Sequence, residues 1–103
     1  DEIELIIQDN TADNTEIVGF LKGRLSPNLK YYHDPVPMPM IANCDLAVLR
    51  ACGEYICFMG DDDLLSLYLL EFVKYMQKEG IDSAVFQNAS SLHAGFNFCD
   101  PYP

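Results

Sequence analysis

The chain has 103 residues, of which 50% are hydrophobic and 12% aromatic. This length fits one compact domain with one core, and the apolar content is too high for a disordered segment. Six Lys and Arg residues against 16 Asp and Glu residues give a net charge of -10, which repels nucleic-acid backbones and anionic lipid surfaces. We therefore treat residues 1–103 as a single domain and expect no nucleic-acid partner.

The cysteines show neither a C-x-x-C pair nor the spacing of a zinc finger; they are Cys44, Cys52, Cys57 and Cys99. This pattern favours buried free thiols, and it therefore predicts a cytoplasmic protein. No apolar run reaches the roughly 18 residues that a membrane-spanning helix needs, and the acidic residue Asp1 is atypical of a signal peptide. Any attachment to the cytoplasmic face of a membrane is expected from parts of the protein outside this sequence.

Apolar runs and turn signals alternate along the chain. The expected strands cover residues 3–7, 29–32, 55–59 and 83–86, and the expected helices cover residues 13–22, 42–52 and 64–79. Asp13 and Glu16 have the spacing of a capping box, and Gly23, Gly53 and Gly80 are expected to end the three helices. Strands that alternate with helices predict an α/β fold, a mostly parallel sheet between two helix layers.

Two acidic loops follow predicted strands. The first covers residues 9–13 and the second residues 61–63. Ligands bind at the carboxyl ends of the strands in open parallel sheets, so both loops are expected on one edge of the sheet.

The three adjacent carboxylates of Asp61, Asp62 and Asp63 repel one another by roughly 1 kcal/mol per pair at 4 Å in water. Either of two arrangements would compensate this repulsion. In the first, the triplet begins a helix and Asp63 is its N-cap. In the second, the carboxylates hold Mg²⁺ or Mn²⁺, whose coordination is completed by the oxygens of a substrate diphosphate.

Residues 51–63 resemble the segment that carries the metal-binding DxD motif in family 2 glycosyltransferases, which have the GT-A fold. Residues 6–15 are similar to the second strand and following loop of that family, and residues 27–32 to the start of its third strand. The resemblance extends from Ile3 to about Asn88. It departs from the usual pattern at Gln8 and Gly60, where an acid is common.

The resemblance implies roles for individual residues. Asp9 is expected to contact the base of a nucleotide-sugar donor. Asp62 is expected to bind the metal, with Asp63 in support and with Asp61 near both the metal and the donor ribose or phosphate. Asn43 is a further candidate for donor binding, although it and Asp45 also suit a helix cap.

The implied reaction is the metal-dependent transfer of a sugar from a nucleotide diphosphate, most simply a UDP-sugar, to an acceptor hydroxyl. The acceptor, a sugar or a lipid-linked molecule, is not specified by these residues. The chain resembles the donor-binding half of a partial catalytic domain, without the first strand and the C-terminal acceptor region, and we expect it to be inactive alone. The general base is unassigned, and Asp100 is the only late candidate.

The sequence is also compatible with two other functions. One is a receiver-type signalling domain in which acids at strand ends hold Mg²⁺, although such a domain needs a late lysine and none follows Lys78. The other is a non-catalytic interaction domain that keeps the fold. An exposed sheet edge also predicts self-association.

Overall fold

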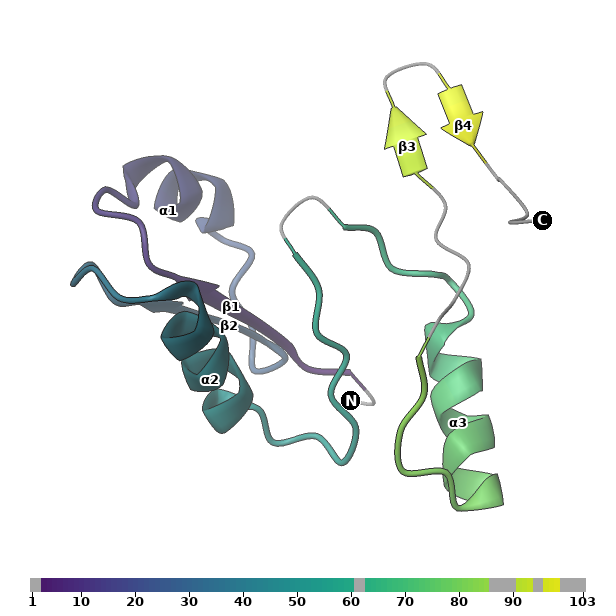
Figure 1. Ribbon diagram of the computed structural model, residues 1–103. Helices are drawn as coiled ribbons and strands as arrows, with labels where there is room; N and C mark the ends of the chain where they lie inside the picture. Colours follow the sequence, from purple (N-terminus) through teal and green to yellow (C-terminus); the bar gives the residue numbers. More distant parts are fainter. Residues whose placement is uncertain (1–2, 61–62, 86–90, 94–95, 99–103) are drawn as a thin grey trace. The chain divides into compact units, whose positions relative to one another are not determined.

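The structure is a computed structural model that describes residues 3–60, 63–85, 91–93 and 96–98, with the backbone alone for the last two segments. The chain divides into two compact units, Asp1–Gly60 and Asp61–Pro103, and each is described by itself (Figure 1). The first unit contains β1 (Leu5–Asp9), α1 (Thr15–Leu21), β2 (Leu29–His33) and α2 (Met40–Arg50). The second contains α3 (Leu69–Glu79), β3 (Ser91–His93) and β4 (Phe96–Phe98).

The first unit is built on a parallel pair of strands. β1 pairs with β2 in a register that runs from Leu5 opposite Leu29 to Asp9 opposite His33. The ladder continues beyond the strands, because the Asp34 N–H donates to the Asp9 carbonyl oxygen at 2.9 Å. Both strands therefore end at the same edge of the sheet, as their connection through a helix requires.

The two helices of this unit border opposite faces of the strand pair. Side chains alternate between the faces along a strand, so Tyr31 and Tyr32 point in opposite directions. Tyr31 lines a cavity of about 200 Å³ together with Val18 and Leu21 of α1. On the other face, the Arg50 guanidinium carbon of α2 lies 4.3 Å from the centre of the Tyr32 ring. In Figure 1, α1 and α2 accordingly flank the β1–β2 pair.

The first helix starts with a different cap from the one that the sequence indicates. Asn14, not Asp13, is the N-cap residue, and no side-chain cap bond is formed there. The Asp13 carboxylate instead accepts the Thr15 N–H at 2.9 Å. This hydrogen bond, from the backbone two residues later to an Asp side chain, forms an Asx turn. The expected capping box is therefore wrong. The expected end is confirmed, because α1 stops at Leu21 and Gly23 adopts a φ of 76°.

The second helix lies two residues before its expected position at both ends. It begins after Pro39, whose φ of −58° precedes the first helical turn, and it ends at Arg50. Gly53 therefore does not end it. The chain leaves the helix earlier because the Cys52 N–H donates to the Glu4 carboxylate at 2.9 Å, which ties this segment to the start of β1.

The expected strands at 55–59 and 83–86 are absent from the residues that the structure describes; Phe86 itself lies outside them. Ile56 and Phe58 are 51% and 58% exposed. An apolar run forms a strand only where a neighbouring strand supplies its ladder bonds, and periodicity does not reveal that neighbour. The second unit instead contains the antiparallel strand pair β3 and β4, which the sequence pattern did not predict.

The third helix begins later than expected. It starts at Leu69 with Tyr68 as its N-cap residue, so the prediction of Asp63 as N-cap is wrong. Ser66 makes the turn that begins this helix, because its hydroxyl accepts the Tyr68 N–H at 3.2 Å and its carbonyl accepts the Leu69 N–H at 3.1 Å. The expected end is confirmed at Gly80, whose φ is 66°.

Few apolar side chains are buried in the described part of the chain. They are Leu21 and Met76, at 4% and 5% exposure. The three described cysteines are free, as expected. Their predicted burial is wrong: Cys44 is only half-buried, and Cys52 and Cys57 are exposed. The two exposed cysteines lie in the irregular segment after α2. Cys99 lies outside the described residues.

None of the helices that the structure describes could cross a membrane, since the longest, α2 and α3, have 11 residues each.

We predict opposite effects of alanine at two glycines of the α1 region. Gly23→Ala forces an L residue into the left-handed region and lowers the free energy of unfolding by about 1 kcal/mol. Gly19→Ala, inside α1, raises it by about 0.5 to 1 kcal/mol through helix propensity. An added Cβ meets nothing within 4 Å at either glycine. Urea denaturation followed by circular dichroism measures both, and equal effects contradict the assigned end of α1.

Candidate functional site

The candidate site lies at the carboxyl ends of β1 and β2. Asp9 ends β1 and is the one buried polar residue among those described, at 8% exposure. Its Oδ1 accepts the Thr11 N–H at 2.8 Å, and its Oδ2 accepts the Tyr31 hydroxyl at 2.6 Å. A buried charge is costly unless hydrogen bonds compensate it, and these two donors do so.

The charge states of Asp9 and Tyr31 follow from this contact. Burial works to raise the pKa of Asp9, but the bonds from the Tyr31 hydroxyl and the Thr11 amide outweigh it and the pKa lies below its usual value. Burial, together with the bond to Asp9, raises the pKa of Tyr31. At neutral pH the Asp9 carboxylate is therefore ionised, and the Tyr31 hydroxyl keeps its proton and donates a hydrogen bond to it. The Asn14 amide in turn donates to the Tyr31 oxygen at 3.1 Å.

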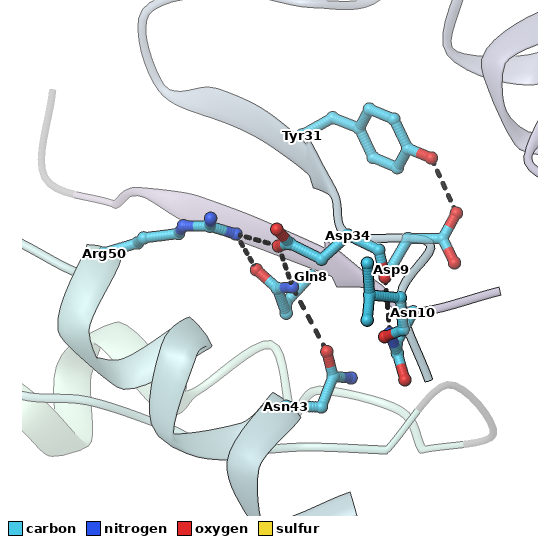
Figure 2. A network of polar contacts seen from close by, with 8 residues as sticks. Gln8, Asp9, Asn10, Tyr31, Asp34, Asn43 and Arg50 are labelled. Atoms are coloured by element: carbon cyan, nitrogen blue, oxygen red, sulfur yellow. Dashed lines mark hydrogen bonds and ion pairs between the residues drawn. The ribbon is translucent and has the colours of Figure 1, made fainter. Parts of the chain in front are cut away.

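A second group of polar contacts, the Gln8 network, consists of Gln8, Asp34, Asn43 and Arg50 (Figure 2). The Gln8 amide nitrogen donates to Asp34 Oδ2 at 2.8 Å and to Asn43 Oδ1 at 3.1 Å. The Arg50 guanidinium donates to Asp34 Oδ2 at 3.0 Å and also to the Gln8 carbonyl oxygen. The network therefore joins β1, the loop after β2, and α2.

Asp34 carries the negative charge of this network. The hydrogen bond from Gln8 and then the bond from Arg50 hold the pKa of the Asp34 carboxyl below its usual value. The backbone around it is also fixed, because the Asn10 amide donates to the Asp34 carbonyl oxygen and, at 2.8 Å, to that of Val36. Asp34 is therefore an ionised acceptor in a fixed loop.

Comparison with known proteins identifies the family. The sequence model of glycosyl transferase family 2 matches residues 1–98. The chain belongs to glycosyl transferase family 2. Neither the curated proteins nor the solved structures include a significant match. Membership in this family confirms the resemblance seen in the sequence, implies a GT-A fold of the α/β class, and assigns the chain to glycosyl transfer in general.

The structure describes three of the five predicted site residues. Asp9 lies at the carboxyl end of β1, as expected. Asn43 lies in the first turn of α2 and accepts a hydrogen bond from Gln8. Because the helix begins after Pro39, neither Asn43 nor the exposed Asp45 is its N-cap, and the interpretation of both residues as helix caps is wrong. Asp63 is exposed and precedes α3.

The other two residues of the acidic triplet, Asp61 and Asp62, lie outside the described residues. Within the part of the chain that the structure covers, no three acidic, histidine or cysteine side chains form a possible metal site. Both the placement of the triplet relative to Asp9 and the metal site remain predictions. The late acid Asp100 also lies outside the described residues.

Sequence reasoning missed four residues of the site: Tyr31, Asp34 and Arg50 entirely, and Gln8 except as a departure from the family pattern. One signal was available for Arg50. It lies seven residues after Asn43, two helical turns on, so both belong to the same face of α2. No comparable signal marked Asp34, whose partners are 16 and 26 residues away.

We predict that Tyr31→Phe destabilises the protein in a pH-dependent way. The variant lacks the hydroxyl that donates to the Asp9 carboxylate, so the free energy of unfolding at pH 7 falls by about 1 to 3 kcal/mol. A carboxylate with a lowered folded pKa contributes stability above its unfolded pKa, about 3.9, and the contribution is lost as the pH falls through the folded pKa. The difference between variant and wild type therefore shrinks below about pH 4.

The control is Tyr32→Phe on the neighbouring residue, which keeps the ring beneath Arg50. Urea denaturation at pH 7 and pH 3 measures both variants. A Tyr31→Phe effect that is equal at the two pH values, or matched by Tyr32→Phe, contradicts the role assigned to the Tyr31 hydroxyl.

Proposed function

We propose that this chain forms the donor-binding part of a metal-dependent glycosyltransferase that transfers a sugar from a nucleotide diphosphate to an acceptor hydroxyl. The donor that we propose is a UDP-sugar. In the complete domain we expect the α/β/α layering of the GT-A fold. Family membership supports the glycosyl transfer, and the polar residues at the carboxyl ends of β1 and β2 support the position of the donor.

The observation that carries the proposal is the buried, ionised carboxylate of Asp9. A carboxylate is an acceptor only, and its two oxygens have about four lone pairs between them. Thr11 and Tyr31 use one position on each oxygen, so Asp9 keeps the capacity to accept an N–H group from a ligand. The N3–H of uracil is such a group, and it is the contact that we propose for the nucleotide base.

Asn43 is the second proposed donor contact. It lies on the face of α2 that meets β1, half-buried, and its contact with Gln8 places it beside the strand that ends in Asp9. A half-buried carboxamide can donate an N–H group to a sugar or phosphate oxygen of a nucleotide.

A divalent cation is the proposed cofactor. Asp61, Asp62 and Asp63 supply the hard oxygen ligands that Mg²⁺ and Mn²⁺ prefer, so the residues present fit the ion by their chemistry. Asp62 is the proposed principal ligand, Asp63 supports it, and Asp61 also lies toward the donor ribose or phosphate. When bound, the cation neutralises the charge that develops on the departing diphosphate. In a chain with net charge -10, it also offsets repulsion of the ligand.

Calorimetric titration with UDP in the presence and absence of Mn²⁺ tests this function. We expect metal-dependent binding that Asp62→Ala abolishes and that Asp9→Asn weakens by about 10- to 100-fold, the loss of one hydrogen bond to a charged group. Asp45→Asn, an exposed change on α2, is the matched control and leaves the affinity unchanged.

Two outcomes contradict the proposal. The first is UDP binding that is indifferent to Mn²⁺ and to Asp62→Ala. The second is an absence of UDP binding combined with phosphorylation of an aspartate by acetyl phosphate, which identifies a receiver-type domain instead.

A further inference from the structure

The orientation of the Gln8 side chain is fixed by two charged neighbours. The Arg50 guanidinium can only donate hydrogen bonds, and the ionised Asp34 carboxylate can only accept them. The carbonyl oxygen of Gln8 must therefore face Arg50, and its amide nitrogen must face Asp34. The bonds that the structure shows, with a nitrogen to Asp34 Oδ2 distance of 2.8 Å, have this arrangement.

Gln8 in turn fixes the orientation of Asn43. The amide nitrogen of Gln8 carries two hydrogens, and Asp34 takes only one of them. The second hydrogen faces Asn43 at 3.1 Å and requires an acceptor, so the oxygen of Asn43 must point to Gln8. Figure 2 shows the result: the nitrogen of Asn43 points away from Gln8.

The outward nitrogen of Asn43 is not fully buried. Among the described residues, none forms a hydrogen bond with this nitrogen. In the described part of the chain, every fully buried side-chain nitrogen or oxygen atom has a hydrogen-bond partner. It follows that this N–H₂ group is not sealed inside the protein. It is a free donor on the face of α2 that meets β1.

We infer that Gln8 is a positioning residue that holds the Asn43 amide so that its N–H₂ group is presented to an oxygen acceptor of the bound donor. The acceptor chemistry is a phosphate oxygen or a ribose hydroxyl oxygen. The inference rests on the proposed function, in which Asn43 contacts the nucleotide sugar, and it adds which end of the Asn43 amide makes that contact.

The double variant Gln8→Glu/Asp34→Asn separates positioning from a merely structural role. The new carboxylate at position 8 accepts from Arg50 and from the new carboxamide at position 34, so one negative charge and the ion pair are retained. That carboxylate cannot donate to Asn43. The Asn43 amide must therefore turn round, and its oxygen then faces outward. Gln8→Glu alone, by contrast, sets two carboxylates against each other, and it serves as the destabilised reference in urea denaturation.

The first measurement needs no ligand. Hydrogen exchange of side-chain amides, followed by NMR on the 103-residue chain, compares the nitrogen-bound protons of Gln8 with those of Asn43. In the wild type we expect the Gln8 protons to exchange about tenfold more slowly than those of Asn43. In the double variant the Asn43 protons become protected by about tenfold. Asn43 protons that are protected in the wild type, or unchanged in the double variant, overturn the inference.

The second measurement identifies the acceptor. With Mn²⁺ present, UDP and uridine are titrated into the wild type and into the double variant. If the acceptor is a phosphate oxygen, the variant loses about tenfold in affinity for UDP and none for uridine; if it is a ribose oxygen, both affinities fall. Wild-type affinity for UDP in a variant whose Asn43 amide has turned overturns the role in binding.

Failure of the proposed function gives a different result. If the wild-type chain binds neither UDP nor uridine, the proposed function fails, while the exchange rates still decide whether Gln8 orients Asn43. Recovery of the urea midpoint in the double variant, relative to Gln8→Glu alone, shows that any lost affinity is not a loss of fold.

Discussion

The in-register parallel pairing of β1 with β2 is the constraint on which the site depends. It places Asp9 opposite His33 and lets Asp34 extend the ladder, so the acidic residues of two strands meet at one edge. Two carboxylates at the edge of an acidic chain need compensation. Asp9 obtains it from the Tyr31 hydroxyl and the Thr11 amide, and Asp34 from Gln8 and Arg50. Each pKa is lowered as a result.

The alternation of side chains along a strand divides these contacts between two faces. Gln8 and Asp9 are neighbours in sequence, so they serve different clusters: Gln8 meets α2, and Asp9 meets Tyr31 near α1. One strand end thus supplies an ionised acceptor from one face and, through Asn43, an N–H donor from the other. A nucleotide carries both kinds of complementary group, and this match supports the proposal that a nucleotide-sugar donor binds here.

The sequence predicted part of the local structure. The strand, helix, strand, helix order of the first fifty residues, the position of Asp9 at a strand end, and the helix ends at Gly23 and Gly80 follow from short-range rules. The predicted caps at Asp13 and Asp63 and the predicted helix end at Gly53 are wrong. Features that depend on distant partners were not predictable. Residues 55–59 read as a strand because their periodicity is that of a buried strand, yet a strand also needs a neighbour. The Gln8 network, likewise, joins residues up to 42 positions apart.

We propose that the nucleotide binds where β1 and β2 end, against Asp9 and Asn43. Backbone amide chemical shifts, followed by NMR during titration with UDP and Mn²⁺, locate the bound nucleotide. We expect the largest shift changes at Gln8 to Thr11 and around Asn43. Changes confined to the cavity between α1 and Tyr31, or to α3, exclude this position.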